Sequence, residues 1–187
     1  QWVVSSVFDW LEARAPSVAG IELCSINLSG QSIGNSNVLD FILEQLTRGV
    51  IAPEKICFEI TETAAIADLV QATQFISRLK ENGCRFALDD FGSGFSSLAY
   101  LKQLPVDYLK IDGSFIRDMA SDNIDYAMVR SINDIGHVMG KQTIAEFVET
   151  ETILNLLRGV GVDFVQGYHI ARPRPLSELS LGADKPT

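Results

Sequence analysis

Six short apolar segments, separated by segments with helical periodicity, recur along almost the whole chain. Each is as long as one buried strand. The six predicted strands are 21–27, 55–60, 85–89, 107–111, 142–146 and 162–166. Strands that alternate with helices in this way are typical of βα units, in which the strands form a parallel sheet. The sequence therefore predicts an α/β protein.

The segments between the predicted strands carry apolar residues at steps of three and four. Helices are predicted over 38–48, 66–82, 124–139 and from 153 onward, each followed by a candidate C-capping glycine: Gly49, Gly83, Gly140 and Gly159. Residues 1–15 are predicted to form a leading amphipathic helix. The residues from 171 onward are predicted to form a closing turn, a short helix and a tail over 176–187.

The number of strands leaves two architectures open. A (β/α)8 barrel needs eight strands and typically about 250 residues, whereas this chain of 187 residues offers six. Either the sheet is an open, doubly wound one, or two strands of a barrel precede Gln1. No linker interrupts the pattern, so one domain over 1–187 is the simplest account.

Every predicted strand ends in a polar residue that could bind a metal ion or a proton. These residues are Asn27, Glu59, Asp89 with Asp90, Lys110, Glu146 and Gln166. In a barrel of parallel strands the carboxyl ends converge on one mouth, where the active site lies. The repeated position predicts one acidic site.

The acids at these positions have both a structural and a functional interpretation. A pair such as Asp89 and Asp90 is usually a solvated turn or a helix cap, but adjacent acids can face opposite ways, so that one bridges two cations while its neighbour completes one of them. Gly92 and Gly94 in the following loop would let its backbone approach a ligand. Glu59 lies between two apolar residues, so it needs a partner, whether in a core salt bridge or at a metal.

Lys110 is likewise a charged residue between two apolar residues, but its charge is positive. It could reach solvent at a strand edge, or it could face the carboxylates, stay protonated and hold a water nucleophile. Singly, Glu146 and Gln166 are more often structural, and Asn27 could simply cap a strand end. Their shared position favours the functional interpretation for all of them.

The composition restricts which metal ions and which partners the chain can bind. Oxygen ligands with only two histidines, His137 and His169, suit Mg²⁺ or Mn²⁺ rather than zinc, and two such ions are a recurrent device for attack on a phosphodiester. A net charge of −9 argues against a nucleic-acid polymer as partner. The three cysteines predict core thiols in a reducing compartment, and no apolar run is long enough to span a bilayer.

Several motifs resemble, in order and spacing, those of one family. They are SINLS at 25–29, FEITET at 58–63, ALDDFGSGFSSLAYLKQLPVDYLKID at 87–112, TIAEFVET at 143–150 and DFVQGYHIARP at 163–173. The chain resembles the EAL-domain family, whose members are bacterial phosphodiesterases that hydrolyse cyclic di-GMP. The resemblance implies a TIM-like (β/α)8 barrel with one antiparallel strand, and an activity that opens the cyclic dinucleotide to linear pGpG with Mg²⁺ or Mn²⁺.

The resemblance also implies a role for each strand-end residue. Asn27, Glu59 and Asp89 would hold one metal ion, and Asp89 would bridge to a second, joined by Asp90 and Glu146. Lys110 would orient the attacking water and Glu62 would brace the loop after Asp90, so these two join Glu146 as expected catalytic residues. The expected substrate-binding residues are Gln166, Asp112 and Ser29, and the expected supporting residues are Glu149, Gly92 and Gly94.

The chain departs from the family pattern in two places. The usual EGVE reads EFVE, with Phe147 in place of glycine, and the Glu-Ala-Leu signature with its metal-ligand glutamate does not occur. We therefore expect a barrel lacking its first two strands, with weak turnover by residues 1–187 alone and association between copies. The resemblance also implies a homodimer, a cytosolic location without membrane contact, and an upstream cyclase-like or sensory domain. A silent receptor for cyclic di-GMP is the alternative function.

Overall fold

The computed structural model describes residues 1–14, 20–92 and 99–179, and within them six strands form one parallel sheet. The strands are β1 (Cys24–Asn27), β2 (Ile56–Thr61), β3 (Arg85–Phe91), β4 (Tyr108–Ile111), β5 (Gln142–Ala145) and β6 (Phe164–Val165). Every neighbouring pair is parallel. The α/β prediction is confirmed, with a strand at each of the six expected places.

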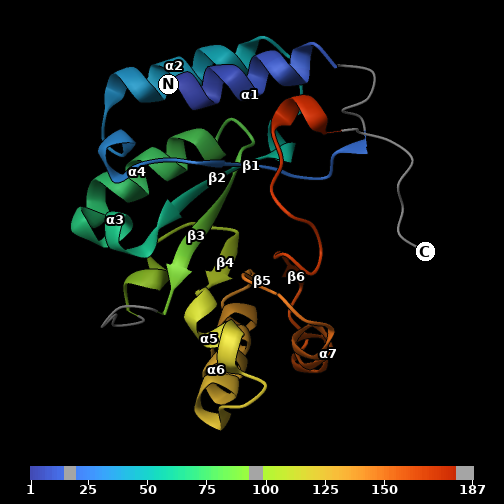
Figure 1. The fold of residues 1–187 in the computed structure, drawn as a ribbon. Coiled ribbons are helices and arrows are strands. Elements are labelled where there is room, and N and C mark those ends of the chain that lie inside the picture. Colours follow the sequence, from blue (N-terminus) through green and yellow to red (C-terminus); the bar gives the residue numbers. More distant parts are fainter. Residues whose placement is uncertain (15–19, 93–98, 180–187) are drawn as a thin grey trace.

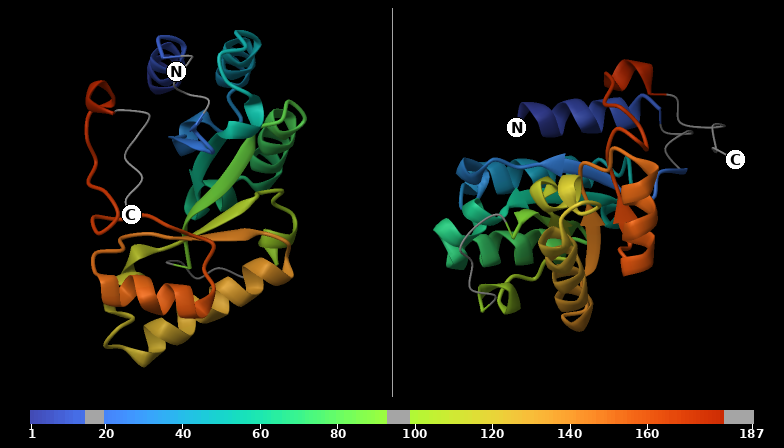
Figure 2. Two further views of the ribbon diagram at one scale, coloured as in Figure 1. Left: turned by 90° about the vertical axis from the view of Figure 1, so that its right-hand side faces the viewer. Right: turned by 60° about the horizontal axis from the view of Figure 1, so that its bottom comes forward.

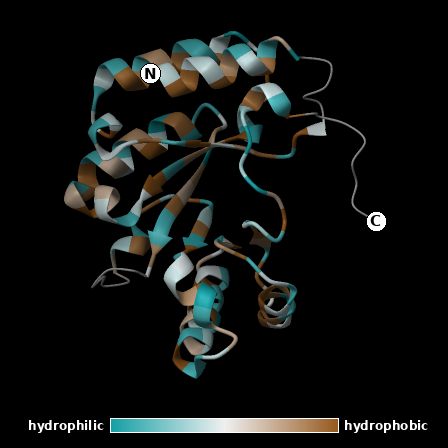
Figure 3. Ribbon diagram, viewed as in Figure 1, coloured by the Kyte–Doolittle hydropathy of each residue, from teal (hydrophilic) through white to brown (hydrophobic). Residues whose placement is uncertain are grey.

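Helices connect the strands (Figure 1). They are α1 (Trp2–Glu12), α2 (Ser36–Thr47), α3 (Glu62–Ala67), α4 (Leu69–Lys80), α5 (Gly113–Asp118), α6 (Asn123–Val138) and α7 (Glu151–Val160). Hydrophobic and hydrophilic residues alternate around α1 and α2, as expected for helices with one buried face (Figure 3). In the described part of the chain, no helix is both long enough and apolar enough to cross a bilayer.

Three details of the helices differ from the sequence-based expectation. The helix predicted over 66–82 is two helices, because Asp68 leaves the helical conformation and its side chain accepts a hydrogen bond from the Gln71 N–H. The short helix α5 was not predicted. Helix α7 includes Gly159 and ends at Val160. The C-cap is Gly161, which adopts the left-handed conformation with φ 86°, so Gly159 is not the C-cap.

The order of the strands decides between the two architectures. The sheet runs β1-β2-β3-β4-β5-β6 in chain order, without the reversal that defines a doubly wound sheet. Sequential parallel strands with helices between them form the wall of a TIM-type barrel. Figure 2 shows that the sheet is curved, with α4, α6 and α7 on its outer side. The described residues form half of such a barrel, in which β1 and β6 are the edge strands.

The two faces of the sheet have separate cores. Residues that face the helices, among them Phe58, Leu88 and Leu109, belong to one large buried cluster. The opposite, inner face carries a second, small cluster: Cys57, Ala87, Tyr108 and Ile144, with Leu23 packed against them. Side chains alternate along a strand, so each strand contributes to both faces. The large cluster on the outer face contributes most of the buried apolar core, and the inner face carries the candidate site.

The cysteines are free, as predicted from their apolar contexts. Cys57 and Cys84 are buried, and burial raises the pKa of each thiol to about 12, while it also raises the pKa of Cys24. Such thiols stay protonated and unreactive at neutral pH.

The inner cluster gives a first testable prediction. Tyr108 is almost fully buried, its ring lies 6.0 Å from that of Phe164, and its hydroxyl accepts from Arg85 Nη1 at 2.5 Å. We expect Tyr108→Ala to lower the free energy of unfolding by about 3 kcal/mol, because it leaves a cavity beneath the strand ends. Tyr108→Phe keeps the ring and should lose less than about 1 kcal/mol. Urea unfolding measures both; equal losses would contradict this packing.

Candidate active site at the carboxyl ends of the strands

Six of the seven strand-end residues predicted from the sequence share one face of the sheet. In the register of parallel strands, Asn27 pairs with Glu59, Glu59 with Ala87, and Lys110 with Ile144. Stepping two residues along the inner face reaches Asp89 from Ala87, and Glu146 from Ile144. The same step from Phe164, the partner of Ile144, reaches Gln166. The alternation of side chains therefore aims all six at the barrel mouth.

Lys110 lies at the centre of this group. Its Nζ atom is 2.7 Å from Glu59 Oε2, 2.8 Å from Asp89 Oδ1 and 2.9 Å from Glu146 Oε1. Only 3% of the residue is exposed. Burial alone would lower the pKa of Lys110, but the surrounding carboxylates, Glu59 first, raise it above its usual value. The ammonium group therefore keeps its proton, as expected from the sequence.

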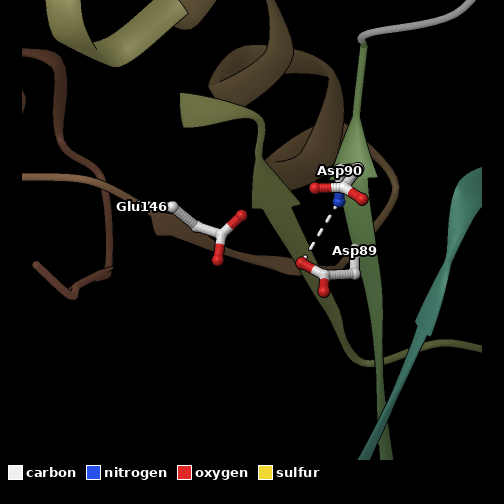
Figure 4. Close-up of side chains that lie close together, drawn as sticks. All are labelled: Asp89, Asp90 and Glu146. Carbon is white, nitrogen blue, oxygen red and sulfur yellow. Dashed lines mark hydrogen bonds between the residues drawn. The ribbon is translucent and has the colours of Figure 1, made fainter. Parts of the chain in front are cut away.

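A bulge brings two consecutive aspartates to the same site. The register between β3 and β4 shifts between Leu88 and Phe91, and Asp90 adopts a positive φ of 54°. The Asp90 N–H donates to Asp89 Oδ1 at 3.1 Å (Figure 4). Adjacent residues of a regular strand would face opposite ways, the possibility that the sequence raised for this pair. The bulge instead turns both carboxylates toward Glu146.

The carboxylates fit a divalent cation. One ligand oxygen from each of Asp89, Asp90 and Glu146 lies within 4.8 Å of the other two. With Glu59, four carboxylates face one ammonium group, so a surplus of negative charge remains. Burial raises the pKa of Glu146 to about 7, and burial also raises the pKa of Asp90, with a contribution from Asp89. An all-oxygen set of this charge suits Mg²⁺ or Mn²⁺.

Glu62 braces the end of β3. The buried carboxylate accepts a hydrogen bond from the Gly92 N–H at 3.1 Å and another from the Tyr100 hydroxyl. Gly92 has φ 98°, and a Cβ there would lie 3.0 Å from Ile132 Cδ1, so only glycine fits. The contact to Gly92 is the one expected of Glu62. Gly94 lies outside the described residues.

The remaining predicted residues lie around this centre in different ways. Gln166 Nε2 donates to Glu146 Oε1 at 2.8 Å, which places the amide beside the carboxylates. Asp112 caps α5 by accepting from the Ser114 N–H at 2.7 Å. Ser29 is exposed and its Oγ lies 3.0 Å from Ser32 Oγ. Glu149 is exposed on the wall of a neighbouring cavity.

That cavity was missed by the sequence analysis. It has a volume of ≈ 520 Å³ and adjoins the acidic site, because Glu146 and Gln166 line both. Its other walls include Phe147, Tyr168 and Arg172. The one available signal was Phe147, which stands where the resembled motif has glycine. Its φ is 52°.

Comparison with known proteins identifies relatives over most of the chain. The model of the EAL domain family matches residues 1–173. The chain is 44% identical over 175 residues, 94% of its length, to the cyclic di-GMP phosphodiesterase PdeB of Shewanella oneidensis, of which it covers 20%. It spans about a fifth to a quarter of the length of the curated relatives it matches.

Solved structures agree with the fold. The PaMucR phosphodiesterase, solved as its c-di-GMP complex, superimposes with a TM-score of 0.85 at 31% identity, over 95% of this chain and 72% of that one. BlrP1 of Klebsiella pneumoniae, solved as a calcium/cy-diGMP complex, gives a TM-score of 0.79 at 26% identity, over 89% of this chain and 43% of that one.

The charge of the site gives a second prediction. A ligand present at one hundred times its dissociation constant stabilises the folded state by about 2.7 kcal/mol. We expect Mg²⁺ or Mn²⁺ to raise the midpoint of thermal unfolding, and Asp89→Asn to remove most of this shift. Asp40→Asn, on the outer helix α2, removes the same charge and should leave the shift intact. Equal shifts in the two variants would contradict a cation site at Asp89.

Proposed function

The chain belongs to the EAL domain family, and from this premise we propose that it hydrolyses cyclic di-GMP to linear pGpG at the carboxyl ends of its strands. The observation that carries the proposal is the buried Lys110 ammonium within 2.9 Å of three carboxylates on the inner face. Relatives named as cyclic di-GMP phosphodiesterases, and a relative solved with c-di-GMP, support the choice of substrate.

Five residues would hold two divalent cations, either Mg²⁺ or Mn²⁺. Asn27 and Glu59 would serve one ion, Asp90 and Glu146 the other, and Asp89 both. When bound, such ions lower the pKa of a water molecule and neutralise charge on the phosphodiester oxygens. The proximity of Asp89, Asp90 and Glu146 supports this set.

Lys110 would orient the attacking water. It is protonated and has three N–H donors, and the carboxylates of Glu59, Asp89 and Glu146 fix its position. A donor released from one of these carboxylates when the substrate binds would hold the oxygen of a water facing the phosphorus. The water oxygen then bonds to phosphorus, the P–O3′ bond breaks, and the proton from the water ends on the O3′ leaving group. One ring opening yields pGpG.

Two residues would act by positioning. Gln166 donates to Glu146 and so fixes the orientation of that carboxylate. Glu62 accepts from the Gly92 N–H and so fixes the chain directly after Asp90. Neither contact needs the substrate, which means that the site is organised before binding.

The proposal predicts a large loss of activity in Lys110→Met. The variant removes the donor for water and leaves the carboxylates without a counter-charge, so we expect kcat to fall by about 100-fold, the lower range for a positioned catalytic group. Formation of pGpG is measured on residues 1–187 and on the natural polypeptide that carries them. Circular dichroism confirms that the variant is folded.

Lys102→Met is the matched control, since Lys102 is an exposed lysine in the connection between β3 and β4. It should retain wild-type turnover. Binding of cyclic di-GMP by the natural polypeptide without any pGpG would contradict hydrolysis and favour the silent receptor. Equal turnover in Lys110→Met and wild type would remove Lys110 from the mechanism.

A further inference from the structure

Phe147 has a backbone conformation that a bulky residue rarely adopts. Its φ of 52° lies in the left-handed region, which favours glycine and, to a lesser extent, asparagine. It follows Glu146 directly, at the end of β5. Conformations of this kind persist only where the surroundings hold them, and they cluster at sites of function.

The ring is held by contacts with two residues of α5. A Cβ added to Gly113 would lie 2.1 Å from Phe147 Cδ2, so the ring lies against the backbone at the start of α5. The Arg117 guanidinium lies 4.2 Å from the ring centroid. These contacts fix the plane of the ring, yet 45% of Phe147 remains exposed.

The exposed part of the ring faces the cavity beside the acidic site. Phe147 lines this space together with Glu146 and Gln166, and Tyr168 lines it from the chain after β6. Arg172 lies 4.7 Å from the Tyr168 ring centroid. The volume of ≈ 520 Å³ falls within the range of about 300–1,000 Å³ typical of small-molecule sites.

We propose that Phe147 is a stacking surface for one guanine base of the bound cyclic dinucleotide. The inference rests on the proposed function, which supplies a phosphodiester held at the neighbouring carboxylates. Phe147 follows Glu146 directly and both line the same cavity, so a base joined through its sugar to a phosphodiester at Glu146 would lie in the space beside the ring. A fixed aromatic ring binds a base through its face and without charge. Glu149, on the same wall, can accept from the N–H groups at the edge of guanine.

The first test measures affinity in variants of Phe147. Cyclic di-GMP is titrated by calorimetry in Ca²⁺, the cation of the BlrP1 complex. We expect Phe147→Leu to raise the Kd about tenfold, since base stacking on one aromatic ring is lost. Phe147→Trp keeps an aromatic face and should bind within about twofold of wild type. Equal Kd values for wild type and Phe147→Leu would overturn the inference.

A double-mutant cycle separates stacking from general damage. Gly113→Ala displaces the ring without changing residue 147, because the three atoms nearest to the added Cβ all belong to Phe147. It should weaken binding in the wild-type background and have no further effect in Phe147→Gly. Equal effects in the two backgrounds would overturn the inference.

Thermal unfolding distinguishes a role of the ring in ligand binding from a role in packing. Phe147→Gly relieves the positive φ, so its unfolding midpoint should stay within a few degrees of wild type while its Kd rises about tenfold. A fall in stability without a change in Kd would show that the ring serves the fold alone. Wild-type protein that binds no cyclic di-GMP would overturn the proposed function itself, and this result is distinct from the others.

Discussion

The ion cluster around Lys110 is the interaction on which the arrangement of the site depends. Burying an ammonium group is unfavourable unless it is paired, and three carboxylates from β2, β3 and the end of β5 provide the pairing. Each comes from a different βα unit, so the cluster forms only when the strands are in register. Removal of Lys110 leaves three carboxylates without a counter-charge on the inner face, which ties the geometry of the site to that of the sheet.

Two strained residues flank this cluster, and both follow buried strand segments. Asp90 and Phe147 are the non-glycine residues with positive φ in the described part of the chain. The bulge at Asp90 adds a carboxylate that regular alternation would turn away, and the turn at Phe147 presents a ring beside Glu146. The bulge at Asp90 interrupts the pairing between Leu88 and Phe91, and Phe147 follows the end of β5, so both conformations lie near the mouth.

Much of the fold could be predicted from the sequence, because the spacing of apolar residues indicates which side chains are buried. The apolar segments gave all six strands, and their polar ends gave the residues that surround Lys110. The bulge could not be predicted, since the two-residue alternation places Asp89 and Asp90 on opposite faces. The break at Asp68 was hidden because the apolar positions of α3 and α4 continue almost in phase. The length of the last strand was not predicted well. The predicted strand covers 162–166, but only residues 164–165 pair with β5.

The chain carries 15 basic and 24 acidic residues, a net charge of −9, and the site itself has more carboxylates than cations. Such a surface repels an anionic dinucleotide. On the proposed function, the phosphodiester would therefore approach only when cations neutralise the carboxylates. A base stacked on Phe147 needs no such compensation, because stacking is insensitive to the charge of the site. The two parts of the ligand would then bind by separable means, with the phosphodiester dependent on the cation and the base dependent on the ring. Because Glu146 and Phe147 are adjacent, one strand end would join the two.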